Sequence, residues 1–356
     1  MMHFDLLPVW LRRAPVLLCA IITLLSGLIA GWVRVGGQVD IPAHWLTWHG
    51  ALLAGFFFPT LIALERAVAT GSPILWTAVA GMCGADLLMV ASGQVNTSLG
   101  MALICALLLF AAHVRLCLEH RALHLWVMTG AILLLASGHL LALKAGYPLA
   151  GLPGWGGFLV LTIMAERIEL SRARRPDRRS QWLMAACCLF MGAGLAAWKD
   201  DGWSQVTAFL GLAGAWAWLW RWDLARLTWR KPGLPGYVGL NVLVAYLWLA
   251  IAVIALPYQR DLSIHALMLG YVFTMVMAHA PVIFPAILRR RLKFSRAFYV
   301  PAVLLQASLV LRALADLSVS ALLLPSATLT IIAIVALFAT TLGHLRPQPV
   351  PFQPAP

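Results

Sequence analysis

Apolar stretches of about 18 to 25 residues recur along the whole sequence, and each can cross the roughly 30 Å hydrocarbon layer of a membrane. Twelve of them lie at about 14–35, 49–69, 74–93, 98–117, 123–144, 152–170, 182–198, 203–220, 237–257, 262–288, 298–316 and 320–343. They are expected to be helices, because an open strand would leave its backbone groups unpaired in lipid. The sequence therefore predicts an all-α polytopic membrane protein with about 12 transmembrane helices.

Composition and charge agree with this class. Only 11% of the residues are charged, whereas a soluble protein has roughly a quarter. The net charge of +13 does not indicate nucleic acid, because the basic residues segregate by side. With the N-terminus in the cytoplasm, 21 of the 26 Lys and Arg residues fall inside, as the positive-inside rule requires. We expect a multi-pass protein of a bacterial-type cytoplasmic (inner) membrane with both termini cytoplasmic. Its partners are the lipid bilayer and, as candidates, a redox partner or other membrane subunits.

The chain is expected to form a single transmembrane domain over residues 1–345, followed by a Pro-rich cytoplasmic tail at 346–356. The first apolar run is too long for a signal peptide and is interpreted as a retained helix. All six cysteines fall within or at the ends of the predicted spans, which does not favour a disulfide framework.

An internal repeat with a period of four helices is suggested by two similar segments. "GFFFPTLIALER" (55–66) and "GGFLVLTIMAER" (156–167) align on Glu-Arg, and Phe57 then meets Phe158. His49 and His265 open two further equivalent helices, with one residue's difference in the spacing to the next glycine. Three pseudo-equivalent four-helix units would span roughly 14–117, 123–220 and 237–343. The alternative is chance similarity among apolar helices, which share few residue types.

Twelve helices in three sets of four, with histidines on the second and tenth, resemble the catalytic subunit of haem–copper oxidases and nitric oxide reductases. The phrases "WHGALLAGF" (48–56) and "HALMLGYVF" (265–273) look like histidine-bearing segments of the NnrS family. That family consists of twelve-helix membrane proteins that contain haem and copper and are linked to nitric oxide stress. The resemblance of architecture covers the whole chain, and its motifs cover about forty residues. It implies one haem b near the outer face, with one axial histidine from each of these two helices.

The residues themselves fit such a site. His49 and His265 both begin their helices at the outer side, so two neutral imidazoles would lie at matched depth on facing helices. Gly50, Gly55 and Gly270 would thin the helix surfaces where a flat macrocycle must fit. The alternatives are structural histidines hydrogen-bonded at a helix end, or a site for another metal.

Two arginines at the outer helix ends, Arg34 and Arg260, are candidates for pairing with the haem propionates, because Arg offers a fixed donor fork to carboxylates. The alternative for both is an interfacial anchor that reaches the lipid headgroups. Arg312 and Asp316 are four residues apart and are expected to pair with one another.

Copper is a second candidate cofactor. His44, expected on the loop before the second helix, and His139, one turn inside the fifth, are its candidate ligands, since imidazole suits copper. Nothing in the sequence brings them together, and a structural role is the alternative for each.

The respiratory active centre of the resembled family has no counterpart here. That centre needs histidines on the sixth and seventh helices and a second one on the tenth. The stretches 152–170 and 182–198 contain no histidine, and Ser263 stands two residues before His265. Oxygen or nitric oxide reductase activity is therefore not expected, and no catalytic residue is assigned.

A polar inner site is predicted at the opposite ends of these helices. His279 lies about 21 Å deeper than His265 and level with Glu65, Arg66, Glu166 and Arg167. If the repeat holds, one polar group from each unit meets there, as a proton entry point or as a second metal or ligand site. The simpler alternative is that each adjacent Glu and Arg neutralise one another and anchor a helix end.

Asp86 lies inside the third helix, too far from either interface to reach it, and must pair, protonate or face a cavity.

The leading interpretation of the chain is a haem b protein of the membrane that acts in electron transport or in a nitric oxide, copper or haem response. The alternative is a proton- or ion-coupled transporter that uses Asp86, Glu65 and His279. A subunit covered by partner helices is a third class.

Overall fold

The structure is a computed structural model that describes residues 9–197 and 202–346. The long helices are α1 (Val9–Arg34), α2 (Ala43–Ala51), α3 (Phe58–Thr70), α4 (Pro73–Ala91), α5 (Val95–His120), α6 (Leu123–Ala145), α7 (Leu152–Ser171), α8 (Arg178–Ala196), α9 (Trp203–Trp222), α11 (Leu234–Ala255), α12 (Arg260–His265), α13 (Thr274–Leu288), α14 (Tyr299–Leu317) and α15 (Leu323–His344). Shorter elements are η3 (Pro148–Ala150), η4 (Arg172–Arg174), α10 (Ala225–Thr228), η6 (Arg296–Phe298) and η7 (Ser320–Leu322). The strands β1 (Arg291–Leu292) and β2 (Leu345–Arg346) pair antiparallel.

Within the described residues, nine helical segments are long and apolar enough to cross a membrane. They are 13–34, 43–70, 73–91, 95–120, 123–145, 234–255, 260–288, 296–317 and 320–344. The prediction of an all-α polytopic membrane protein is confirmed at this level. Helices α7, α8 and α9, of 20, 19 and 20 residues, do not meet the same criterion of length and composition.

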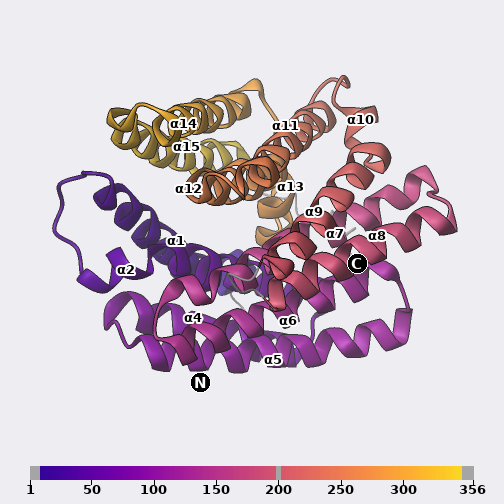
Figure 1. Cartoon of the computed structure of the whole chain (residues 1–356), viewed down its shortest axis with the longest axis horizontal. Helices are drawn as coiled ribbons and strands as arrows, with labels where there is room; N and C mark the ends of the chain where they lie inside the picture. Colours follow the sequence, from indigo (N-terminus) through magenta and orange to yellow (C-terminus); the bar gives the residue numbers. More distant parts are fainter. Residues whose placement is uncertain (1–8, 198–201, 347–356) are drawn as a thin grey trace, which may run out of the picture.

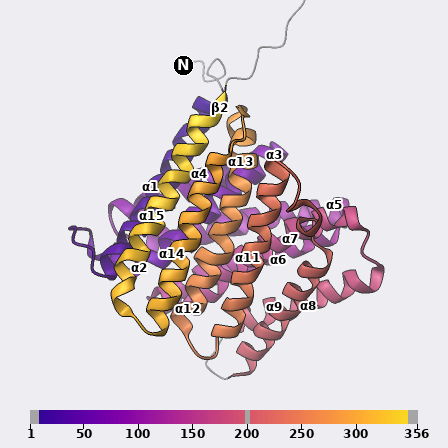
Figure 2. The ribbon, with the colours of Figure 1, turned by 90° about the horizontal axis from the view of Figure 1, so that it is seen from above.

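Neighbouring helices in the chain are mostly neighbours in space, as short connections require. Pairs α4 and α5, α5 and α6, α6 and α7, α8 and α9, and α14 and α15 pack along their lengths. In Figure 1 the helices α4, α5 and α6 lie along one side of the molecule, and α11, α12, α14 and α15 lie along the other. Figure 2 shows α2 and α12 toward one end of the bundle and α3, α13 and β2 toward the other.

Two of the membrane-length segments are interrupted by π-helix at corresponding places. Between α2 and α3 lies η2 (Leu52–Phe57), and between α12 and α13 lies η5 (Ala266–Phe273). His49 stands shortly before the first π segment, and His265 directly before the second. A π segment adds residues to a helical turn and is frequent at functional sites. The unequal spacing from each histidine to its glycine therefore falls where the helical register is irregular.

Small residues let α6 and α7 approach closely, as is usual in membrane proteins. A Cβ atom placed on Gly154 would lie 2.6 Å from the Cα and N of Gly138 and 2.6 Å from the carbonyl oxygen of Leu134. Backbone atoms cannot move aside as a flexible side chain can. The α6–α7 contact therefore depends on the missing side chain at Gly154.

We expect Gly154→Ala to lower the free energy of unfolding of the detergent-solubilised protein by about 1–3 kcal/mol, the usual cost of overpacking a tight contact. Gly130→Ala on α6 is the matched control, because a Cβ there meets nothing within 4 Å. Equal unfolding midpoints for the two variants would contradict the close α6–α7 contact.

One helix begins earlier than the sequence predicts, and two segments on which predictions were made lie outside the described residues. His44 was expected on a loop but lies in the first turn of α2, because the helix begins directly after Pro42, whose ring suits the start of a helix. Of the predicted tail, Arg346 lies in β2 and residues 347–356 fall outside the described part. Lys199, one of the few basic residues assigned to the outer side, also lies outside it. The six cysteines are free thiols.

Candidate functional site

His49 and His265 lie near one another at one end of the bundle, which we call the histidine end. Both rings are half-buried. The electrostatic surroundings of His49 include the imidazole of His265 and the guanidinium groups of Arg34 and Arg312. Two helices far apart in sequence thus bring each histidine into the electrostatic surroundings of the other.

The hydrogen bond of His265 determines which ring nitrogen is available. Its Nδ1 lies 2.7 Å from the carbonyl oxygen of Asp261. A carbonyl only accepts, so Nδ1 carries the proton and Nε2 keeps its lone pair. This backbone contact of the second nitrogen is the arrangement that orients a metal-binding histidine.

His49 has a different surrounding. Its Nδ1 is buried without a hydrogen-bond partner, and its Cδ2 would lie 3.7 Å from a Cβ placed on Gly31 of α1. Within the described residues, Nε2 of neither His49 nor His265 makes a hydrogen bond. Each helix therefore presents an imidazole nitrogen that is free to accept a ligand bond.

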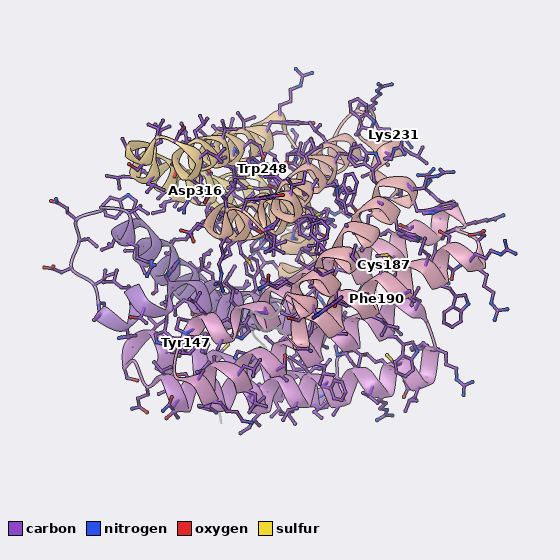
Figure 3. All side chains as sticks on the ribbon, viewed as in Figure 1. Tyr147, Cys187, Phe190, Lys231, Trp248 and Asp316 are labelled. Atoms are coloured by element: carbon purple, nitrogen blue, oxygen red, sulfur yellow. The ribbon has the colours of Figure 1, made fainter. Side chains whose placement is uncertain are left out.

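The cations beside this pair are Arg34 and Arg312. Arg34 ends α1 and donates to the carbonyl oxygen of Leu46 at 3.0 Å. Arg312 is held by Asp316, whose two carboxylate oxygens lie 3.0 and 2.9 Å from its Nε, so the predicted pair on α14 is confirmed. Figure 3 labels Asp316 on this helix and Trp248 on α11, whose Nε1 donates to Gln306 Oε1 of α14 at 2.6 Å.

Arg260 begins α12, the short helix that ends at His265. It lines an apolar groove bordered by α7, α8, α9 and α11, and neither His49 nor His265 lines that groove. The electrostatic surroundings of His49 include Arg34, one of the two predicted arginines, together with Arg312. The sequence drew attention to the helix-end arginines because of their depth alone.

An apolar cavity lies between α1, α15 and the two interrupted helices. Its lining includes Phe57 and Phe273, each eight residues after its histidine along the interrupted helix. The other residues that line it are Leu17, Ala20, Ile21, Leu24, Leu61, Val276, Phe284, Ile334, Leu337 and Phe338. The same two helices that carry the histidines therefore enclose apolar space on the inner side of the pair.

The predicted copper ligands His44 and His139 make separate contacts. Trp155 Nε1 lies 3.3 Å from Nδ1 of the fully buried His139. Since indole only donates, this nitrogen accepts, and the proton of the neutral ring is on Nε2. His44 Nε2 lies 3.4 Å from the carbonyl oxygen of Val90. No hydrogen bond, ion pair or ring contact joins the two histidines in the described residues.

The described residues also contain no group of three or more His, Cys, Asp or Glu side chains that could hold a metal ion. At His139 one nitrogen accepts from Trp155 and the other carries the proton. That leaves no lone pair for copper in this arrangement.

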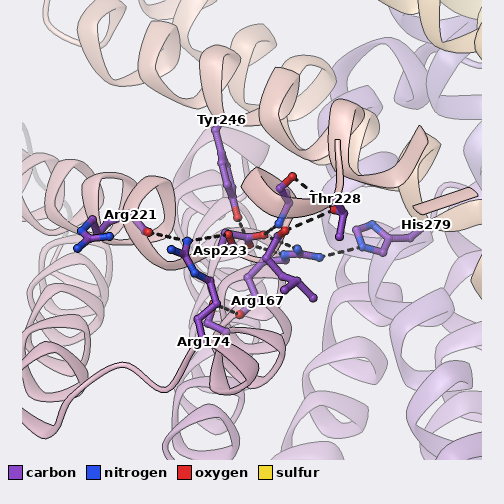
Figure 4. A network of polar contacts seen from close by, with 10 residues as sticks. Arg167, Arg174, Arg221, Asp223, Thr228, Tyr246 and His279 are labelled. Atoms are coloured by element: carbon purple, nitrogen blue, oxygen red, sulfur yellow. Dashed lines mark hydrogen bonds and ion pairs between the residues drawn. The ribbon is translucent and has the colours of Figure 1, made fainter. Parts of the chain in front are cut away.

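The opposite end of the bundle, which we call the arginine end, contains a buried ion-pair network (Figure 4). Arg167 contacts both carboxylate oxygens of Asp223, through Nε at 2.7 Å and Nη2 at 2.6 Å. The hydroxyl of Tyr246 donates to the same carboxylate at 2.6 Å, and so does the backbone N–H of Ala225 at 2.6 Å. Such bidentate, charge-assisted pairing is the strongest hydrogen bonding that a carboxylate receives.

His279 joins this network on the other side of Arg167. Its Nδ1 lies 2.7 Å from the carbonyl oxygen of Met275, and its Nε2 lies 3.4 Å from Nη1 of Arg167. The backbone contact places the proton on Nδ1, so Nε2 accepts from the guanidinium. The network thereby links α7, the α9–α10 connection, α11 and α13.

Arg66 forms a second ion-pair cluster. Its Nη2 lies 2.8 Å from Glu166 Oε1 and 3.1 Å from Glu65 Oε1. The structure therefore brings together Glu65, Arg66 and Glu166, and separately Arg167 and His279. Both the neutralisation of adjacent charges at a helix end and a contact between the predicted units occur here.

Asp223 and Tyr246 were not identified from the sequence. Asp223 is the single acidic residue in the basic segment 221–231, which was a signal that it has a specific cationic partner. Burial alone would raise the pKa of Asp223, but its hydrogen bonds and ion pair with Arg167 outweigh this and lower it. The carboxylate is thus held ionised beside a buried guanidinium.

Asp86 is buried between α1 and α4. Its Oδ2 lies 3.4 Å from Thr23 Oγ1 and 4.0 Å from Cys19 Sγ. Among the described residues it has no cation within ion-pairing distance. Asp86, Glu65 and His279 line neither of the two apolar cavities described above.

Comparison with curated proteins and with solved structures finds no match to this chain. A family model for a domain of unknown function, DUF8744, matches residues 13–346, and the chain therefore belongs to the DUF8744 family.

Proposed function

We propose that this protein binds one haem b in the membrane, with His49 and His265 as the two axial ligands. The observation that carries the proposal is the pair itself: two imidazoles from different helices lie together, and the Nε2 of each has no partner in the described residues. The backbone contact of His265 Nδ1 at 2.7 Å supports the neutral tautomer that a ligand needs.

The residues around His49 and His265 match the charge of a haem, whose porphyrin ring carries two propionate groups. Arg34 and Arg312 would carry the positive charge for the propionates, and the apolar cavity beside Phe57 and Phe273 would take the hydrophobic edge. When bound, the haem supplies reversible one-electron chemistry at an iron whose potential depends on its ligands and burial. The residues of the chain hold, orient and shield it.

The proposal includes the architecture that the resemblance to NnrS proteins and haem–copper oxidases implies. In this arrangement α7, α8 and α9 complete twelve spans, and the chain forms three four-helix units in a bacterial-type inner membrane with both termini cytoplasmic. The paired π segments after His49 and His265 support the equivalence of two of these units. With both axial positions filled by histidine, electron transfer is favoured over the binding of a gas.

Copper is left out of the proposed function, because His139 has no free lone pair in this arrangement. The transporter alternative is not adopted here, since Asp86, Glu65 and His279 contact different residues and are not joined in one site. An oxygen- or nitric oxide-reducing centre is also left out, because 152–170 and 182–198 supply no histidine.

The proposal is tested by purifying the full chain in detergent from haem-sufficient cells. Absorption spectra are recorded for the oxidised and the dithionite-reduced protein, with iron and copper content measured on the same sample. We expect sharp low-spin b-type bands and iron in equal amount to protein. A preparation with no Soret band would overturn the proposed function.

A further inference from the structure

An apolar groove with one cationic residue at its mouth lies on the other side of α12 from the histidine pair. It is an open groove with a volume of about 110 Å³ between α7, α8, α9, α11 and the segment that begins at α12. Gly156 and Val160 line one wall, and Leu267 and Met268 line the opposite one. In a membrane, apolar space of this kind is open to lipid chains and not to water.

Among the described residues that line the groove, Arg260 alone carries a charged side chain, and it is exposed. Its guanidinium makes no hydrogen bond or ion pair within the described residues. Of the same lining residues, Ser263 alone has a hydroxyl group, and its Oγ already donates to the carbonyl oxygen of Ala252 at 2.8 Å. A free cation at the end of an apolar groove matches the two parts of an anionic amphiphile.

The groove runs along the helix axes. From Arg260 to Met268 on one wall, and from Leu152 to Val160 on the other, the lining covers eight residues, or about 12 Å of helix. Tyr258, two residues before the start of α12, is 83% exposed. Exposed aromatic residues near a helix end mark the interfacial belt of a membrane. Arg260 is therefore placed where headgroups lie, with the groove extending into the hydrocarbon layer.

We propose that this groove binds a phospholipid, with its phosphate paired to the Arg260 guanidinium and one acyl chain lying between the Gly156 and Met268 walls. Bidentate donors of Arg suit phosphate oxygens. The described residues of the lining include no His, Cys, Asp or Glu side chain, and so they offer neither a strong iron ligand nor a proton acceptor for quinol oxidation. The lipid site does not depend on the proposed haem.

The test uses the full chain, purified and delipidated in detergent, and titrated with dioleoylphosphatidylglycerol. Native mass spectrometry reads the one-lipid adduct. We expect Arg260→Ala to weaken this adduct about fivefold, which corresponds to about 1 kcal/mol. Arg175→Ala, which removes an exposed arginine at the other end of the bundle, should leave it unchanged.

A second variant tests the proposed position of the acyl chain and leaves Arg260 in place. Gly156→Leu would fill the groove opposite Met268, whose Cε already lies 3.2 Å from a Cβ built at that position. We expect it to reduce the adduct while the unfolding midpoint and elution volume stay close to those of the wild type. Equal lipid binding by Arg260→Ala and wild type would overturn the proposal. Stoichiometric recovery of a quinone or a porphyrin from the groove instead of phospholipid would overturn it as well.

Discussion

Replacing His265 by alanine is expected to abolish the low-spin haem spectrum and to weaken haem retention by at least about 10- to 100-fold. That range is already reached when only a hydrogen-bond partner of a ligand is removed, and His265 would itself be a ligand. The nearby guanidinium groups and the apolar cavity cannot replace an axial bond. The measurement is the haem-to-protein ratio of the purified variant, together with its reduced spectrum.

His49→Ala should give the same loss, because each histidine would supply one axial bond. His120→Ala is the matched control, since His120 is exposed at the end of α5 and contacts neither histidine. The control should keep the wild-type haem content. Full haem content in both His49→Ala and His265→Ala would show that the axial ligands lie elsewhere.

Asp223→Asn is expected to lower the free energy of unfolding by about 3–5 kcal/mol, the usual cost of leaving a buried charge without its partner. Asn would accept one hydrogen bond but would leave the positive charge of Arg167 uncompensated, with only 5% of that side chain exposed. The measurement is thermal unfolding in detergent. Because Arg167 also contacts His279, the variant should loosen the arginine end as a unit.

Asp177→Asn provides the control. Asp177 is exposed and caps α8 by accepting from the Ser180 N–H at 2.8 Å. Asn caps helices about as well as Asp, so a change of less than about 0.5 kcal/mol is expected. A loss for Asp223→Asn that does not exceed the loss for Asp177→Asn would contradict the proposed importance of the buried pair.

The stabilisation of the folded state by the Asp223 carboxylate should decrease at low pH. Its folded-state pKa is lowered, so its stabilisation is fully present above the ordinary value of about 3.9. The stabilisation is lost as the pH falls through the lowered pKa. The difference between wild type and Asp223→Asn should therefore be full at neutral pH and shrink below about pH 4.

Much of the architecture followed from the sequence, because membrane thickness and backbone hydrogen bonding leave few alternatives to long helices. The Glu-Arg alignment of the repeat likewise anticipated that Arg66 and Glu166 belong to one region, and they pair at 2.8 Å. Helix positions and the approximate depth of polar residues in the membrane could thus be predicted from a single sequence.

Contacts that depend on how each helix is rotated about its axis could not be predicted from the sequence. Arg260 and Arg312 both stand at suitable depth, but the sequence does not show that Arg312 contributes to the surroundings of both histidines while Arg260 lines a groove, because adjacent helices determine which face is turned inward. Asp223 stands in a basic segment and becomes a buried partner only through tertiary packing with Arg167. The π segments also leave no clear trace in the residue pattern.

We propose a single haem held by two histidines at the histidine end. Electron paramagnetic resonance of the oxidised, purified full chain is the decisive experiment, because the signal reports the axial ligands of the iron. We expect a low-spin ferric signal typical of two imidazoles, which His49→Ala and His265→Ala each eliminate. A high-spin ferric signal in the wild type, or no haem signal at all, would contradict it.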